Sequence, residues 1–331
     1  MERSVKIEVT SGDALVIDAD ILALKYAQDF YGVDKRVARR LLQDSGAVDI
    51  TPRVGGFRLV ASGGAIAANN VLFVGVPEPY EFGYREIREF SIKVLSSLAG
   101  EAPATRVLAL TLHGPGYGLD EAECFLSEVA GLTDAVSSGD FPAQLEIVKI
   151  VEQNEGRAGR LRALLDTYVP DGRIDVDARI LRSRIGEERS ETLRAIGYDS
   201  GQKPHVFVAM PFADDMVDLF HYGIQRAIGA TGFLCERIDQ LPSVGDILVR
   251  VKERIKTAVF VVAELTSANP NVYLEVGYAW GCGVPTVLLI QKNELASLRF
   301  DVAGQRCIVY SSIRDLEEKL SSELTALADQ I

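Results

Sequence analysis

One stretch of the chain carries an acidic side chain in a setting suited to catalysis. It reads NPNVYLEVG over residues 269–277 and follows an apolar run that predicts a β-strand. The NPN tripeptide predicts a turn that caps a helix, with Glu275 one turn inside that helix. Because apolar residues flank Glu275, we expect the helix to pack into the protein. A carboxylate at a pocket mouth can be a nucleophile or can stabilise an oxocarbenium-like centre during glycosidic cleavage. The alternative is an acid that only stabilises the helix start.

Two further loops in the same half of the chain carry side chains that can bind a ligand. Met210-Pro211-Phe212 follows one predicted strand, where the proline fixes the turn and the next helix N-terminus can face an anionic or hydroxyl-rich ligand. Arg237 and Asp239 follow the next strand and point the same way if that strand continues. The alternatives are a plain strand-to-helix turn and a surface salt bridge.

Near the end of this half, Asp301 and Arg306 follow the last predicted loop. Arginine offers a planar fork of donors that suits a phosphate. Equally, Arg306 can pair with Asp301 and close the loop.

The first half of the chain has a glycine-rich loop. Gly114, Gly116 and Gly118 permit a close approach of the backbone to a phosphate, and His113 directly precedes them. An ordinary tight turn is the alternative. The histidines have no partner spacing that would indicate a metal site, and we expect no metal.

The order of apolar and helical patterns predicts two α/β domains. We expect a mixed α/β domain over residues 1–168, a charged helical connector over 169–203, and a domain over 204–331 with a parallel sheet covered on both faces. Ligands in such sheets bind beyond the carboxyl ends of the strands, where the loops described above lie. The predicted strands cover 5–9, 21–24, 58–61, 70–76, 106–112 and 145–151, then 206–209, 232–235, 258–263, 286–290 and 307–310.

Composition excludes several classes of protein. The 331 residues carry a net charge of −12 without a basic cluster, which disfavours a nucleic-acid partner. Four separated cysteines indicate neither a disulfide framework nor a zinc site. Without an apolar signal core or a stretch of about 18 apolar residues, we expect a cytoplasmic protein that does not contact a membrane.

The second half resembles the TIR-like and nucleoside 2-deoxyribosyltransferase-like superfamily. The matching segments are VFVAMPF at 206–212, CERID at 235–239, AVFVVAELTSANPNVYLEVGYAWGCGVPTVLLI at 258–290 and RFDVAGQRCIVY at 299–310. This resemblance implies a flavodoxin-like fold and maps the family's catalytic glutamate, which acts at an N-glycosidic bond, onto Glu275. We expect the substrate-binding residues around it to be Met210, Pro211, Phe212, Arg237, Asp239, Asn269, Asn271, Asp301 and Arg306.

This sequence lacks additional acidic residues that the deoxyribosyltransferases carry, which favours NAD as the substrate. We expect no cofactor. Their additional acidic positions fall near Val251 and on Asn269 here, although Asp246 or Glu253 can replace the lost acid. NAD needs less acid catalysis because nicotinamide leaves as a neutral molecule. The resemblance therefore favours an NAD glycohydrolase. The alternatives are a nucleoside or nucleotide N-glycosidase or 2-deoxyribosyltransferase, and a nucleotide-binding module without activity.

The first half resembles macro-like domains, particularly the N-terminal domain of leucine aminopeptidases. The matching segments are VKIEVTSGD, IDADILAL, ASGGAIAANNVLFVGVPEP and LTLHGPGYGLD. The resemblance implies that Asp13 and the loop from Gly114 to Asp120 line a nucleotide or ADP-ribose pocket. A sensor joined to a hydrolase is typical of bacterial anti-phage effectors, in which a nucleotide messenger triggers assembly. We therefore expect a nucleotide-activated homo-oligomer.

Overall fold

The structure is a computed structural model that describes residues 3–46, 49–238, 244–298, 302 and 304–329. The chain forms two compact units. Unit 1 comprises residues 1–114 and 121–201, and unit 2 comprises 115–120 and 202–331. Each unit has its own β-sheet with helices, which confirms the two α/β domains predicted from the sequence.

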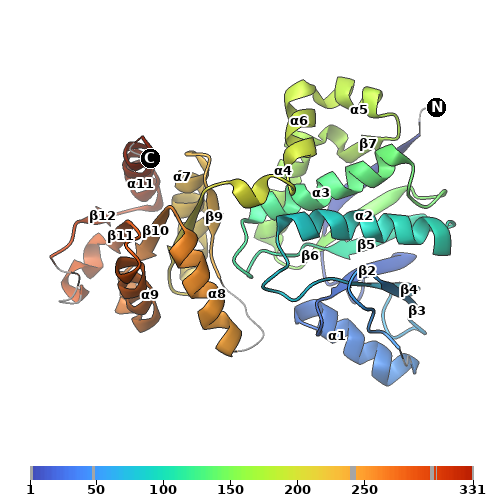
Figure 1. Cartoon of the computed structure of the whole chain (residues 1–331), viewed down its shortest axis with the longest axis horizontal. Coiled ribbons are helices and arrows are strands. Elements are labelled where there is room, and N and C mark those ends of the chain that lie inside the picture. Colours follow the sequence, from blue (N-terminus) through green and yellow to red (C-terminus); the bar gives the residue numbers. More distant parts are fainter. Residues whose placement is uncertain (1–2, 47–48, 239–243, 299–301, 303, 330–331) are drawn as a thin grey trace. The chain divides into compact units, whose positions relative to one another are not determined.

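Unit 1 is built on a mixed sheet of seven strands in the order β3-β4-β2-β5-β6-β1-β7 (Figure 1). The inner strands pair in parallel, whereas β3 and β7 at the two edges are antiparallel to their neighbours. The strands are β1 (Ser4–Ser11), β2 (Ile21–Tyr26), β3 (Phe57–Ala61), β4 (Asn70–Gly75), β5 (Val107–Thr111), β6 (Ile147–Glu152) and β7 (Arg173–Asp175).

The two longest helices of unit 1 approach each other closely. A Cβ atom at Gly131 of α3 would lie 2.2 Å from the backbone oxygen of Arg88 on α2, so only glycine fits between these helices. The helices of unit 1 are α1 (Gly32–Arg40), α2 (Tyr84–Glu101), α3 (Glu121–Ser138), α4 (Glu155–Tyr168), α5 (Ala178–Ile185) and α6 (Glu187–Ala195), and a π-helical turn covers Leu41–Ser45.

The segment that we expected to be a connector, residues 169–203, folds with unit 1 as far as Gly201. Its β7 pairs with β1, although the sequence shows no strand pattern there. Leu181 and Ile185 on α5 and Leu193 on α6 are buried. A strand of three residues is too short to show the alternation by which strands are predicted.

Unit 2 has a parallel sheet of five strands in the order β12-β11-β10-β8-β9. Numbered from the first strand of the unit, this is the flavodoxin-like order 2-1-3-4-5. Every residue of β8 and β10 is buried, as predicted for strands covered on both faces. The strands are β8 (His205–Ala209), β9 (Leu234–Glu236), β10 (Phe260–Glu264), β11 (Thr286–Gln291) and β12 (Cys307–Tyr310).

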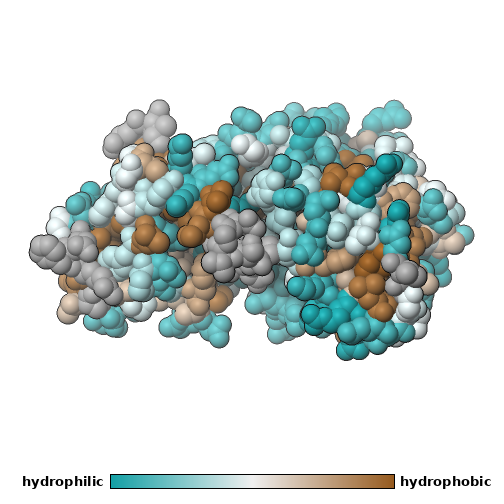
Figure 2. All heavy atoms as spheres, turned by 60° about the horizontal axis from the view of Figure 1, so that its bottom comes forward, coloured by the Kyte–Doolittle hydropathy of each residue, from teal (hydrophilic) through white to brown (hydrophobic). Residues whose placement is uncertain are grey.

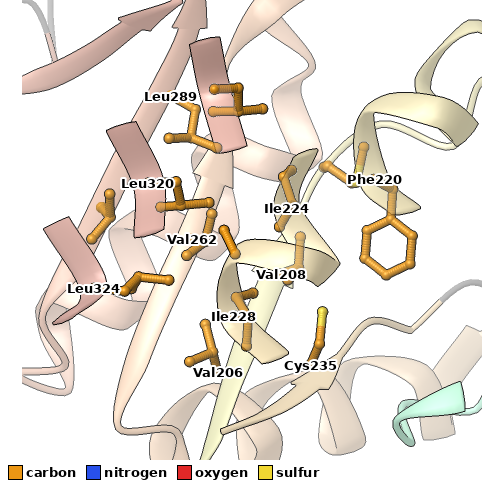
Figure 3. Close-up of a cluster of buried hydrophobic side chains, with 14 of the residues drawn as sticks. Val206, Val208, Phe220, Ile224, Ile228, Cys235, Val262, Leu289, Leu320 and Leu324 are labelled. Atoms are coloured by element: carbon orange, nitrogen blue, oxygen red, sulfur yellow. The ribbon is translucent and has the colours of Figure 1, made fainter. Parts of the chain in front are cut away.

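Helices cover both faces of this sheet. On one face, Val208 and Val262 pack with Ile224, Ile228 and a row of leucines from α11 (Figure 3). The other face packs against α8 and α9. The helices are α7 (Arg226–Gly229), α8 (Val244–Thr257), α9 (Pro270–Gly281) and α11 (Ile313–Ala328), with a π-helical segment at Leu219–Gln225 before α7.

Helix α11 was not predicted from the sequence. The Ser312 side chain accepts a hydrogen bond from the Asp315 amide and so caps its start. Leu316, Leu320 and Leu324 recur every fourth residue and are fully buried against the sheet. These three leucines place the helix although its other face is charged.

The surface is mostly hydrophilic, with separate apolar patches on the face shown in Figure 2. Among the described residues, none of the helices combines the length and the apolar character that crossing a membrane requires.

Candidate functional site

The strand order of unit 2 predicts where a ligand can bind. The chain runs outwards in opposite directions from β8 and β10, because β9 follows β8 on one side and β11 follows β10 on the other. In doubly wound sheets the ligand crevice lies beyond the carboxyl ends of the strands at this switch point. The loops after β8, β9 and β10 therefore form the candidate site.

The loop after β8 contains the predicted residues Met210, Pro211 and Phe212. Met210 is buried in the core, whereas the Phe212 side chain is 62% exposed. A large apolar side chain that is exposed beyond the carboxyl end of a strand is available to stack on a planar ligand. Pro211 lies between them, in a stretch without regular secondary structure, and has no backbone N–H to donate.

The structure brings Arg237 to this loop. Its guanidinium carbon lies 4.0 Å from the ring centre of Phe220 and 5.5 Å from that of Phe212. An Arg237 N–H also donates a hydrogen bond of 3.2 Å to the sulfur of Met210. Met210, Phe212 and Arg237 therefore lie close together, with Phe220 as a fourth member that the sequence did not indicate. These cation–π contacts fix the position of the planar guanidinium group.

The loop after β10 leads directly into α9, the helix that carries Glu275. The Asn269 side chain accepts a hydrogen bond of 2.9 Å from the Asn271 amide and caps this helix. Pro270 occupies the first turn, where its missing N–H costs nothing. Asn269 thus has a structural role, and the Asn271 side chain is exposed beside it.

Glu275 lies at the border of the buried face of α9. Val272, Val276 and Ala279 of this helix pack into the core, and the Glu275 side chain is half-buried beside them. Burial raises the pKa of the Glu275 carboxyl from 4.5 to about 7. Among the described residues, no hydrogen bond or ion pair to this carboxyl is found. At neutral pH the carboxyl is therefore available in both its ionised and its protonated form.

A second buried acid, at the end of β10, was not among the residues predicted from the sequence. Glu264 is the last residue of β10 and is fully buried. Burial raises the pKa of its carboxyl from 4.5 to about 7 as well. One carboxyl oxygen accepts a hydrogen bond of 2.9 Å from the Thr266 amide. An acidic residue at the end of an apolar strand is the signal in the sequence that indicates such a position.

Of the three remaining predicted residues of unit 2, the structure describes only Arg306. Asp239 and Asp301 lie outside the described residues. Arg306 forms an ion pair of 2.8 Å with Glu323 of α11, and its side chain is 81% exposed. The described partner of Arg306 is therefore Glu323, and neither of the two partners considered from the sequence, a phosphate and Asp301, is described.

The positions on α8 that bear on an additional catalytic acid differ in burial. Val251 is buried in the core, as expected for an apolar residue on α8. Glu253 is exposed on the same helix. Asp246 lies outside the residues whose side chains the structure describes.

In unit 1, Asp13 already has partners. It forms an ion pair of 3.0 Å with Arg36, and one of its oxygens accepts a hydrogen bond from the Leu15 amide. A ligand at Asp13 would compete with, or extend, these contacts.

His113 belongs to a buried polar cluster of unit 1. Its Nδ1 lies 3.3 Å from the ammonium nitrogen of Lys25, which in turn forms an ion pair of 2.8 Å with Asp34. Because an ammonium group can only donate, Nδ1 accepts from it. Burial, assisted by the Lys25 charge, holds the pKa of His113 well below 6.5, so the ring is neutral. Burial also raises the pKa of Glu128, a fully buried acid on α3, well above 4.5.

The glycines of the predicted phosphate loop all have positive φ angles, which favour glycine: 103° at Gly114, 88° at Gly116 and 94° at Gly118. Gly114 belongs to unit 1, whereas Gly116 and Gly118 belong to the segment Pro115–Asp120 of unit 2. The five predicted sensor residues are therefore not all part of unit 1.

Unit 1 also contains a cavity of about 370 Å³ between the end of β4 and α2. None of the predicted sensor residues lines it. Its apolar wall comes mainly from Val74, Val76, Phe90 and Ile92, and Lys93 and two glutamates of α2 supply charge.

Comparisons with known proteins give weak similarities of fold. No family model and no curated protein matches the chain. Among solved structures, a Trypanosoma brucei macrodomain in complex with ADP-ribose is 14% identical, with a TM-score of 0.41, over 48% of this chain and 69% of that one. An Oceanobacillus iheyensis macrodomain is 10% identical, with a TM-score of 0.38, over 50% of this chain and 97% of that one.

A Clostridium botulinum CMP N-glycosidase is also similar in structure. It is 16% identical, with a TM-score of 0.30, over 36% of this chain and 98% of that one. At these identities and scores, neither the ligands nor the activities of the three proteins are transferred to this chain.

Proposed function

We propose that unit 2 is an N-glycosidase that hydrolyses the nicotinamide–ribose bond of NAD, with Glu275 as the catalytic carboxylate. The observation that carries this proposal is the state of Glu275, which is half-buried, has a pKa raised to about 7, and has no partner among the described residues. A carboxylate that is poorly solvated and unpaired gains most from a positive charge placed beside it.

NAD supplies such a charge. Its nicotinamide ring is cationic, and cleavage moves the positive charge onto the ribosyl centre as neutral nicotinamide departs. Glu275 in its ionised form would stabilise that centre or trap it covalently, and water would complete hydrolysis. No separate acid is needed for the leaving group, in keeping with Val251 in the core and Asn269 in a helix cap.

The loops after β8 and β9 offer groups for the rest of a dinucleotide. Arg237 is held against Phe220 and Phe212, and its donor edge suits a diphosphate. The exposed ring of Phe212 offers a stacking surface for a base. These assignments make Arg237 and Phe212 binding residues and leave the bond cleavage to Glu275.

The test is to incubate the purified full chain with NAD and, separately, with a pool of ribonucleotides, deoxynucleotides and deoxynucleosides, and to identify products by chromatography with mass detection. We expect nicotinamide and ADP-ribose from NAD, and no product with Glu275→Gln. The matched control is Glu253→Gln, which removes an exposed acid from α8. Release of a free base only from the nucleotide pool would replace NAD with a nucleoside or nucleotide substrate. Turnover of neither substrate class, both with and without the nucleotide ligands named in the next paragraph, would leave a binding module.

We further propose that unit 1 takes a nucleotide ligand that switches this activity on, as in a defence effector that assembles and depletes NAD. The proposal is based on the glycine-rich sequence of the loop, in which Gly114 has a positive φ angle that favours glycine but is itself buried. Each assay should therefore be repeated with cyclic nucleotides and ADP-ribose derivatives, while light scattering follows the mass of the particle. If these ligands change neither turnover nor mass, the regulatory proposal fails and the catalytic one is unaffected.

A further inference from the structure

Glu264 occupies an unusual position for an acid, at the carboxyl end of the central strand β10. Residues of this strand alternate between the two cores, with Val262 on the face of α11 and Ala263 on the face of α9. Alternation places Glu264 on the α11 face, fully buried. Glu275 lies on α9, which packs on the opposite face, so any effect of Glu264 on α9 has to pass through the backbone that joins them.

Two hydrogen bonds tie the chain after Glu264 to the sheet. The Glu264 carboxyl accepts from the Thr266 amide at 2.9 Å. The Thr266 hydroxyl oxygen in turn accepts from the amide of Gln291, at the end of β11, at 3.0 Å. A buried amide without such an acceptor would be left unsatisfied, which accounts for a polar side chain in this apolar setting.

These bonds secure a strained turn. Ser267 and Ala268 have φ angles of 67° and 48°, so two successive residues with a Cβ are in the left-handed region. Such a conformation persists only where neighbouring contacts determine it, and it is typical of functional sites. Asn269 follows at once and caps α9. The geometry of this turn therefore sets where α9 begins and how it is rotated.

We propose that Glu264 is a positioning residue which, through Thr266 and Gln291, holds the 266–268 turn and so places α9 and its Glu275 for catalysis. This inference rests on the proposed function for its kinetic consequence. It does not make Glu264 a catalytic residue, because the residue touches the loop and not the reacting atoms.

Two matched pairs of variants test the inference. Glu264→Gln and Thr266→Ser keep an oxygen acceptor at each position, whereas Glu264→Met and Thr266→Val remove it at similar volume. A displacement of about 1 Å of a catalytic group lowers turnover on the order of 10²-fold. We therefore expect kcat for nicotinamide release to fall about 10- to 100-fold in the Met and Val variants and to stay within about threefold in the Gln and Ser variants. The KM for NAD should change little in all four, since Arg237 and Phe212 precede the turn and bind from other loops.

A second readout does not need activity. Amide hydrogen exchange of peptides covering 270–281 should accelerate in the Met and Val variants and remain as in wild type in the Gln and Ser variants, with exchange in α11 unchanged. If all four variants keep wild-type kcat and exchange, or if Gln and Ser lose as much as Met and Val, the positioning role is refuted. If the wild-type protein releases no nicotinamide but hydrogen exchange in the variants responds as expected, the proposed function is contradicted. The inference that Glu264 positions α9 would still hold.

Discussion

Replacing Glu264 by glutamine should stabilise unit 2 at alkaline pH and change its stability little in acid. The side chain is fully buried, and burial raises the pKa of its carboxyl from 4.5 to about 7. Between these two values the folded protein binds more protons than the unfolded chain. The free energy of unfolding therefore falls as the pH rises through this window, and glutamine removes that dependence.

The size of the effect follows from the shift. Each pKa unit corresponds to about 1.4 kcal/mol, so a rise from 4.5 to about 7 weakens the folded state by up to roughly 3 kcal/mol once the pH exceeds 7. Since Glu264 is fully buried, solvent does not screen this penalty. Glu275 contributes in the same direction but is present in both proteins, so it cancels in the comparison.

The assay is urea unfolding followed by tryptophan fluorescence at about pH 5 and about pH 9. The chain has one tryptophan, Trp280, which lies on α9 and so reports on unit 2. Glu253→Gln, which changes an exposed residue on α8, is the control, and its free energy of unfolding relative to wild type should not depend on pH. The reasoning would be refuted if the difference in free energy of unfolding between Glu264→Gln and wild type were the same at both pH values. Such a result would mean that the pKa of Glu264 is not raised in the folded state.

Three further predictions concern the proposed activity and the packing of unit 1. In wild type, kcat/KM for NAD should rise with pH through about 7 as Glu275 ionises, and a rate profile that is flat from about pH 6 to 9 would contradict this. Arg237→Met should raise the KM for NAD about tenfold or more with little change in kcat, and an unchanged KM in steady-state kinetics would exclude Arg237 from binding. Gly131→Ala should lower the melting temperature, at a cost of about 1–3 kcal/mol, because the new methyl group meets the backbone oxygen of Arg88. Gly159→Ala on α4, where a Cβ atom would meet no atom within 4 Å apart from the backbone of its own helix, should be neutral or stabilising in the same melting experiment.

The strands of both sheets except β7 could be predicted from the sequence, because strands buried on both faces, such as β8 and β10, require continuous apolar runs. The predicted strand at 307–310 coincides with β12, the one at 206–209 lies one residue short of β8, and those of the first half match β1 to β6 within a few residues. The helix that carries Glu275 could be predicted for a local reason as well, since the NPN cap lies in the sequence itself. Where local chemistry decides the structure, the sequence is sufficient.

Contacts between distant residues could not be predicted in the same way. The stacking of Arg237 on Phe220 and the ion pair of Lys25 with Asp34 depend on how elements pack. The burial of Glu264 also depends on packing, because an acidic residue at the end of a strand is buried only where other elements cover it. The sequence therefore identifies Glu275 as a candidate but not the groups that surround it.

The most direct test of the central claim is a comparison of wild type with Glu275→Gln for NAD cleavage and NAD binding on the same samples. Glutamine keeps the size of the side chain and removes its charge. We predict that nicotinamide release falls on the order of 10³-fold, while calorimetry shows NAD binding within about threefold of wild type. A variant that binds NAD and still releases nicotinamide at the wild-type rate would contradict the assignment of Glu275 as the catalytic carboxylate.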